Sequence, residues 1–87
     1  MTINLKSIGK RVKKFRKTKR MTQAQLAEMT NLSDVFISRV ETGDKNVSLT
    51  SLVKIAIALN VTLDDLVALD EVIEFEDGSN ILVDENY

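Results

Sequence analysis

The sequence has 87 residues, of which 44% are apolar, and its formal net charge is −1. It contains no cysteine and no histidine. This length allows one small domain, and the missing cysteines exclude disulfides and thiolate metal sites. Without histidine and cysteine, the commonest general base, thiol nucleophile and imidazole ligand are absent, so we expect no enzymatic activity, no metal and no cofactor. No apolar run approaches the roughly 20 residues that span a bilayer, and the polar first ten residues do not fit a signal peptide. We therefore expect a cytoplasmic protein.

Charge is distributed unevenly along the chain. The segment 6–20 contains nine lysines and arginines and no acidic residue, whereas the segment 70–87 contains seven acidic residues and no basic one. A ligand responds to the local potential rather than to the net charge. The basic segment therefore suits a polyanionic partner, although a basic run by itself is more often a solvated helix face.

The first predicted helix lies in the basic segment. Leu5, Ile8, Val12 and Phe15 recur at helical spacing and form one apolar stripe. Gly9 interrupts this helix at a cost of about 1 kcal/mol relative to alanine. Close backbone packing or close approach to DNA would each explain a glycine there.

A second helix is predicted to begin at Thr22, because Thr22 and Gln25 have the spacing of a capping box. Leu26 and Ala27 are expected to face inward, together with either Met29 or Thr30. Asn31 follows where a sharp turn must occur, since asparagine tolerates the left-handed conformation.

Ser33 is expected to cap a third helix, with Asp34 in its first turn and Gly43 just past its end. Ile37 and Val40 would face the core. Ser48 is expected to cap a fourth helix, which Asn60 ends, and 62–67 opens a fifth. The apolar stripe of the fourth helix consists of Leu49, Leu52, Val53, Ala56 and Leu59.

The acidic C-terminal segment has a different pattern. Residues 72–76 and 81–83 are short apolar or alternating runs that flank turn-forming residues 77–80, which is typical of a β-hairpin. An isolated hairpin is marginally stable in water. We therefore expect the helical body or a second copy of the chain to cover its apolar face, formed by Ile73, Phe75, Ile81 and Val83.

An ordered set of residues over 5–69 follows one recurring pattern. Its members are Arg16, Thr22, Gln23, Leu26, Ala27, Ile37, Ser38, Glu41, Gly43, Ser48, Leu49, Leu52, Ile55, Ala56, Ala58, Leu59, Leu63, Asp64 and Leu66. This set resembles the Cro and lambda-repressor family of helix-turn-helix proteins, also called the xenobiotic-response-element family. Two residues depart from the family pattern, since Asn31 replaces a frequent turn glycine and Val47 replaces a frequent proline. The acidic segment lies outside the family core.

The resemblance implies a mainly α fold, namely a five-helix lambda-repressor-like bundle, here followed by a short C-terminal β-hairpin or strand. It also implies that the third helix enters the major groove of DNA and that Arg16 pairs with Glu41 inside the fold. The base-reading residues that it implies are Ser33, Asp34, Val35, Phe36, Ser38 and Arg39. The expected phosphate contacts are Gln23, Lys45 and Asn46.

Several of these residues allow more than one role. Arg39 is the strongest candidate for reading guanine, because its fork matches O6 and N7. Either Val35 or Phe36 would contact a thymine methyl group, and Phe36 would otherwise belong to the core. Asp34 would accept from cytosine N4 or, as we favour, serve only as an acid in the first turn of its own helix.

We therefore expect a sequence-specific transcriptional regulator, most simply a repressor, that binds a palindromic operator as a homodimer. Residues 1–69 would form the DNA-binding domain, and 70–87 would serve dimerisation or bind a protein partner. One alternative is an antitoxin that binds a basic toxin through its C-terminal segment, and another is a restriction–modification controller protein. A further alternative for the acidic segment is that it folds back onto the basic helix and weakens non-specific DNA binding.

Overall fold

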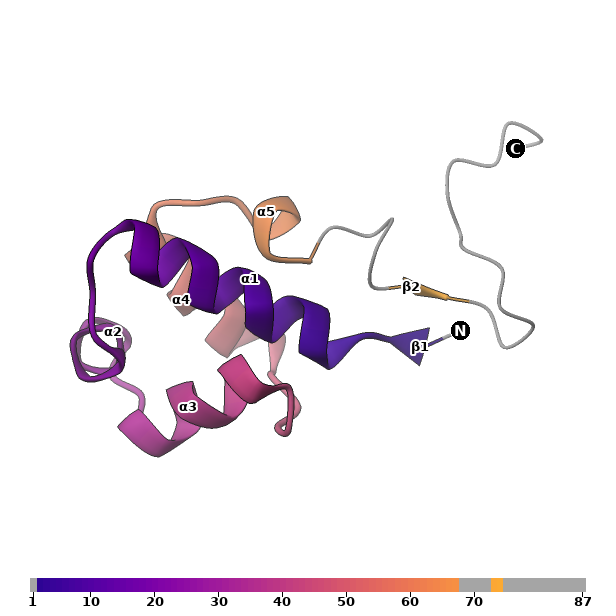
Figure 1. Cartoon of the computed structure of the whole chain (residues 1–87), viewed down its shortest axis with the longest axis horizontal. Coiled ribbons are helices and arrows are strands. Elements are labelled where there is room, and N and C mark those ends of the chain that lie inside the picture. Colours follow the sequence, from indigo (N-terminus) through magenta and orange to yellow (C-terminus); the bar gives the residue numbers. More distant parts are fainter. Residues whose placement is uncertain (1, 68–72, 75–87) are drawn as a thin grey trace.

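The computed structural model describes residues 2–67 and 73–74, and five helices account for most of them (Figure 1). The helices are α1 (Leu5–Thr18), α2 (Gln23–Thr30), α3 (Asp34–Thr42), α4 (Leu49–Leu59) and α5 (Leu63–Val67). A two-residue strand β1 (Thr2–Ile3) pairs antiparallel with β2 (Ile73–Glu74), with Thr2 opposite Glu74 and Ile3 opposite Ile73. The described part of the chain is thus mainly helical, with the five expected helices.

The helix ends follow from the capping residues in the sequence. Thr22 Oγ1 accepts a hydrogen bond from Gln25 N at 3.0 Å, and Gln25 Oε1 accepts one from Thr22 N at 2.8 Å, which completes the capping box. The hydroxyls of Ser33 and Ser48 accept hydrogen bonds at the starts of α3 and α4. The left-handed C-caps are Asn31, Gly43 and Asn60, with φ of 57°, 78° and 57°.

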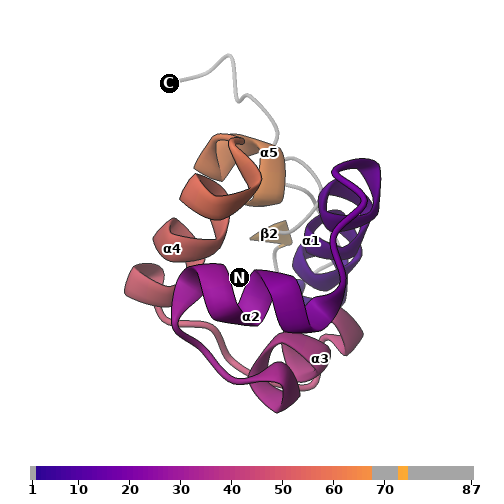
Figure 2. The same cartoon turned by 90° about the vertical axis from the view of Figure 1, so that its left-hand side faces the viewer.

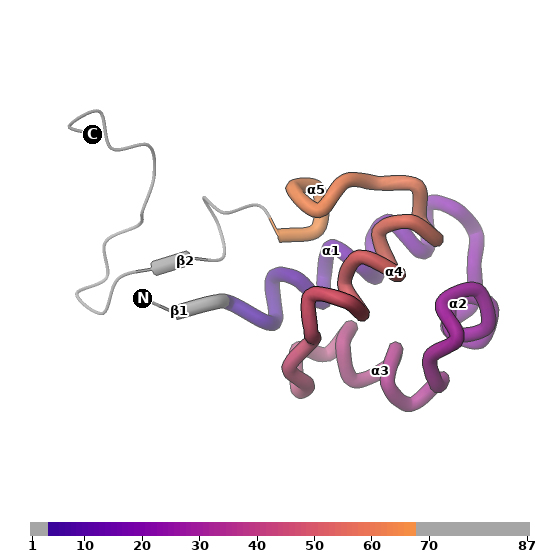
Figure 3. The backbone as a smooth tube through the Cα atoms, turned by 180° about the vertical axis from the view of Figure 1, so that it is seen from behind, coloured from indigo at the N-terminus to yellow at the C-terminus, as the bar shows by residue number. Residues whose placement is uncertain are grey.

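The core lies inside the bundle and receives side chains from all five helices. α1 is at the front in Figure 1 and α4 is at the front in the reverse view of Figure 3, while α3 runs along the lower edge in both. Figure 2 shows the helices arranged around this interior. The side chains that are almost completely buried there are Val12, Leu26, Ile37, Val40, Ile55, Leu59 and Leu66.

Gly9 lies where α1 crosses the end of α3 at very short range. A Cβ atom at this position would approach the carbonyl oxygens of Val40 and Glu41 to 2.3 and 2.6 Å. Such distances are not compatible with any side chain. Close packing of the α1 and α3 backbones therefore accounts for this glycine.

The structure decides one open alternative in the expected apolar stripes and corrects one residue of them. Thr30 is buried and donates its hydroxyl to Leu26 O at 2.7 Å, whereas Met29 is 60% exposed, so the inward residue of that pair is Thr30. Leu49 was expected on the stripe of α4, which is wrong, because it is 69% exposed. It is the first residue of α4 and precedes the turns that pack on the bundle.

The C-terminal segment is described only at Ile73 and Glu74. These residues form a strand, as expected, but the strand with which they pair is β1 at the other end of the chain. The second arm of the predicted hairpin, 81–83, lies outside the described residues. Among the helices that are described, none has both the length and the apolar character to cross a membrane.

Candidate nucleic-acid interface

The connection between α2 and α3 is a tight turn with defined hydrogen bonds. Asn31 adopts the left-handed conformation, and the next residue, Leu32, donates its backbone N–H to Ala27 O at 3.0 Å. The Leu32 side chain packs against the core. Ser33 then caps α3 by accepting from Phe36 N at 3.0 Å. Because each residue of this turn is bonded or packed, α3 leaves α2 at a fixed angle.

The two sides of α3 differ sharply in exposure. Ile37 and Val40 are 0% and 1% exposed, and they hold the helix on the core. The opposite side is open to solvent and has no bulky core residue. We call this open side the reading face, and it consists of Ser33, Asp34, Val35, Ser38 and Arg39, of which Ser38 is half-buried and the others are exposed.

Phe36 lies at the border between these two sides. Its ring is half-buried and packs against the core cluster. The ammonium group of Lys45 lies 5.8 Å from the centre of the ring, which is within the range of a cation–π interaction. Phe36 therefore supports Lys45 in the loop after α3. Asn46, the next residue of this loop, is exposed.

A buried ion pair joins α1 to α3 behind the reading face. Arg16 Nε donates to Glu41 Oε2 at 2.6 Å, and Arg16 Nη2 donates to Glu41 Oε1 at 3.0 Å. The expected pair is thus present, with side chains only 9% and 2% exposed. Arg16 Nη1 also donates to Met21 O at 2.7 Å. These bonds fix the end of α1, the loop to α2 and the end of α3 relative to one another.

Gln23 adds α2 to the same network. Its amide Nε2 donates to Glu41 Oε1 at 3.0 Å, and the residue is half-buried. The expectation for Gln23 was a phosphate contact, whereas its amide nitrogen is held inside the fold. Its backbone N–H still begins α2, and the first N–H groups of a helix have no intrahelical acceptor. Free N–H groups of this kind are what anions contact at a helix N-terminus.

Positive charge covers the outer surface of α1. Lys10, Lys13, Lys14 and Lys17 are exposed. A shallow groove of about 210 Å³ on this helix is lined by Ser7, Lys10, Arg11 and Lys14. Arg11 Nη1 donates to Asp65 O at 3.2 Å, so this groove lies on the side of α1 that faces α5. It is a separate surface from the reading face of α3.

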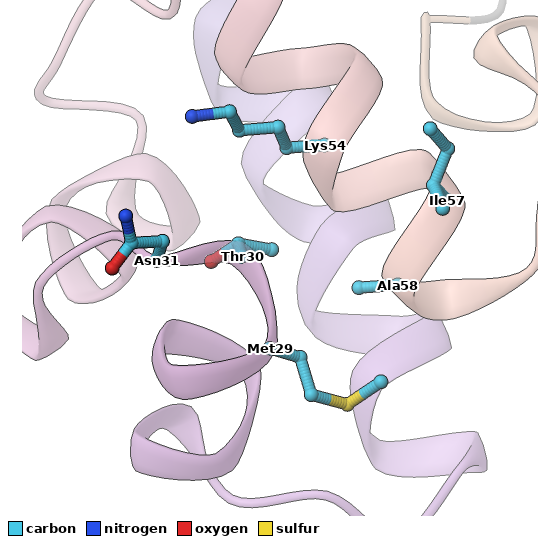
Figure 4. Close-up of a pocket in the computed structure, with 6 residues that line it drawn as sticks. All are labelled: Met29, Thr30, Asn31, Lys54, Ile57 and Ala58. Atoms are coloured by element: carbon cyan, nitrogen blue, oxygen red, sulfur yellow. The ribbon is translucent and has the colours of Figure 1, made fainter.

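An apolar depression of about 350 Å³ lies between α2 and α4 (Figure 4). Met29 and Ile57 are 60% and 73% exposed there. The hydroxyl of Thr30 already donates to the Leu26 and Ala27 carbonyl oxygens. Its lining contains one charged residue, Lys54, and no acidic residue.

The sequence did not reveal two of these contacts. The spacing between Phe36 and Lys45 matches no helical rule, because a helix end and a loop separate them. The hydrogen bond from Gln23 to Glu41 joins residues 18 positions apart. The signal in the sequence was a polar residue, Gln23, at the start of α2. It indicated a phosphate contact rather than a hydrogen bond inside the fold.

Comparison with known proteins agrees with this geometry. A family model described as helix-turn-helix matches residues 12–66. An immunity repressor protein of Bacillus phage phi105 is 36% identical over 70 residues, which cover 80% of this chain and 49% of the repressor. The matched region thus spans about half the length of that relative.

Two solved structures are also similar to this chain. The restriction–modification controller protein C.AhdI from Aeromonas hydrophila has a TM-score of 0.70 and 34% identity, covering 71% of this chain and 94% of the controller. The master regulator for biofilm formation SinR, solved in complex with DNA, has a TM-score of 0.65 and 32% identity, covering 68% of this chain and 95% of the SinR chain.

Proposed function

Because the chain belongs to this helix-turn-helix family, we propose that it is a sequence-specific DNA-binding transcriptional regulator, in the simplest case a repressor. The observation that carries the proposal is the reading face of α3. Its exposed side is polar around a single apolar residue, Val35, while Ile37 and Val40 hold the helix from behind. This is the arrangement that a helix in the major groove requires.

In this proposal α3 enters the major groove, and Arg39 donates from its guanidinium to guanine O6 and N7. Ser33 and Ser38 form hydrogen bonds with other base edges, and Asp34 serves the N-terminus of its own helix. The phosphates are contacted by the backbone N–H of Gln23, by Lys45 and by Asn46. Phosphate contacts position the protein, and base contacts select the sequence.

The proposed active form is a homodimer on a palindromic operator, with two α3 helices about one DNA turn apart. Residues 1–69 form the DNA-binding domain, and residues 70–87 support the dimer or bind a protein partner. A core of this size gains stability from association. The proposal places the protein in the cytoplasm, and it assigns no enzymatic step and no cofactor to the chain.

The direct test is selection of bound duplexes from a random pool with the full chain. We expect enrichment of a two-fold symmetric sequence whose half-sites are roughly 10 base pairs apart. The Arg39→Ala variant should relax selection at one base pair of each half-site, at a cost of about 1–3 kcal/mol. Lys14→Ala, on the α5 side of α1, is the matched control and should leave the selected sequence unchanged. No enrichment at all, or an affinity independent of salt, would contradict the proposal.

A restriction–modification controller is the second candidate. It is favoured by the similarity to C.AhdI, of which this chain covers 94%. Genes for a restriction endonuclease and its methyltransferase beside this gene would support it. An antitoxin role depends instead on the acidic segment 70–87, and copurification with a basic partner protein would support that role. All three functions share the proposed DNA contact by α3.

A further inference from the structure

Val35 is the apolar exception on the reading face. Four large apolar side chains are mostly exposed in the part of the chain that the structure describes, and Val35 is the one of these that lies on α3. It is 66% exposed, and its neighbours on the reading face are a carboxylate, hydroxyls and a guanidinium. An apolar group at the centre of a polar contact surface gains free energy when a partner covers it.

Phe36 is not available for the same contact. Its ring packs against the core, and the Lys45 ammonium lies 5.8 Å from the centre of the ring. Moving this ring into a groove would remove it from the core and detach Lys45. The structure therefore separates two adjacent apolar residues into an outward-facing one, Val35, and a supporting one, Phe36.

We infer that Val35 packs against the 5-methyl group of a thymine, next to a guanine that Arg39 reads in the same half-site. The thymine methyl is the apolar feature that base pairs present in the major groove. This inference rests on the proposed function, and it adds the chemical identity of two bases. Val35 is then a specificity-determining residue, and Phe36 is a positioning residue for Lys45.

The spacing of the two residues sets the spacing of the two bases. Val35 and Arg39 are four positions apart in α3 and therefore lie on the same face, with Cβ atoms roughly 5–6 Å apart. Successive bases on a strand are about 3.4 Å apart along the DNA axis. The thymine and the guanine consequently lie within about two base pairs of each other, and the thymine is the base nearer the N-terminus of α3.

The test uses the full chain and the duplex selected above, with each thymine replaced in turn by deoxyuridine, which lacks only the methyl group. We expect one position per half-site at which the wild-type protein loses about fourfold in affinity, as for the burial of one methyl group. The Val35→Ala variant should bind the thymine duplex several-fold more weakly and should not distinguish thymine from uracil. The Phe36→Leu variant is the matched control and should keep the wild-type ratio of affinities for the thymine and the uracil duplexes. This ratio does not depend on the fraction of protein that is folded.

Discrimination that persists in Val35→Ala, or that disappears in Phe36→Leu, would overturn the inference. Selective, salt-dependent binding that is indifferent to uracil at every position would overturn it and leave the proposed function standing. If no duplex is enriched from the random pool, the proposed function fails and this inference fails with it.

Discussion

The guanidinium of Arg16 and the carboxylate of Glu41, 25 residues apart in the sequence, form a buried bidentate ion pair to which Gln23 adds a third hydrogen bond. Three helices of the bundle meet at this one carboxylate. Removing it leaves a buried guanidinium without its counter-charge, which is much more costly than losing an exposed pair.

We expect Glu41→Ala to lower the free energy of unfolding by about 3–5 kcal/mol, measured by urea denaturation. Glu28→Ala, an exposed acid on α2, is the control and should change it by less than about 0.5 kcal/mol. The double variant Arg16→Met with Glu41→Leu should recover much of the loss, because an apolar pair no longer buries an uncompensated charge. A small effect of Glu41→Ala would show that the pair contributes little.

Gly9→Ala is expected to destabilise the protein by at least about 1–3 kcal/mol. At an ordinary helical position this change would stabilise by up to about 1 kcal/mol, but here the new Cβ meets two backbone carbonyl oxygens of α3. Thermal unfolding of Gly9→Ala measures the loss of stability. Lys13→Ala, at an exposed position of α1, is the control that shows the effect of alanine in this helix without the contact to α3. A Gly9→Ala variant as stable as the wild type would contradict the close crossing of α1 and α3.

Lys45→Ala should weaken DNA binding about equally for specific and random duplexes, and it should reduce the slope of log affinity against log salt by about 1. The reason is that one ammonium group leaves the phosphate contacts. Titrations at several salt concentrations measure this slope, with Lys54→Ala, an exposed position of α4 away from both α1 and the reading face, as the control. A change in sequence preference would assign Lys45 to a base rather than to a phosphate.

Asp65 is expected to titrate below its ordinary pKa of 3.8. The backbone N–H of Thr62 donates to its carboxylate at 2.9 Å and is the main cause of the lowered pKa, followed by the Thr62 side chain and, more weakly, by the charge of Arg11. A lowered pKa stabilises the fold above the unfolded-state pKa, and this contribution is lost as the pH falls through the folded-state pKa.

The acid sensitivity of unfolding should therefore be smaller in Asp65→Asn than in the wild type, in the range at and below pH 3.8. Carboxyl chemical shifts followed by NMR measure the pKa directly. Asp64→Asn, a neighbour in the first turn of α5, is the matched control. Equal acid sensitivity in all three proteins would show that the hydrogen bond from Thr62 to the Asp65 carboxylate does not stabilise the fold.

On the hypothesis that the seven acidic residues of segment 70–87 compete with DNA for the basic surface of α1, we expect truncation after Leu69 to tighten binding to random duplex DNA. A full-length variant with these seven acids changed to their amides should bind random duplex equally tightly. Fluorescence anisotropy measures the binding, and sedimentation measures the oligomeric state. Unchanged binding together with dissociation of a dimer would assign the segment to dimerisation instead.

The helices and their ends could be predicted from the sequence because they depend on local chemistry. Thr22, Ser33 and Ser48 accept hydrogen bonds within the next three residues, and Asn31 and Asn60 adopt the left-handed conformation that asparagine tolerates. The pairing of Arg16 with Glu41 is not local, and it was implied by the family resemblance rather than by the spacing.

What the sequence did not predict depends on contacts between distant segments. The position of Lys45 near the Phe36 ring depends on the path of a loop, and the pairing of β1 with β2 joins residues 2–3 to residues 73–74. The exposure of Leu49 shows a limit of periodicity, since the pattern does not indicate where a helix first meets the core. The base-reading residues remain predictions, although the structure gives Val35 and Phe36 different environments.

The shared carboxylate of Glu41 has a mechanical consequence for any duplex that this surface binds. Glu41 lies on α3, and its Oε1 accepts from Gln23 of α2 while both of its carboxylate oxygens accept from Arg16 of α1. The start of α2 is therefore held at a fixed distance from α3. In the proposed complex, any change of shape on binding is made by the DNA. We expect sequences whose groove width or bendability already suits that distance to be bound there at lower deformation energy, which extends selectivity to base pairs that no side chain touches.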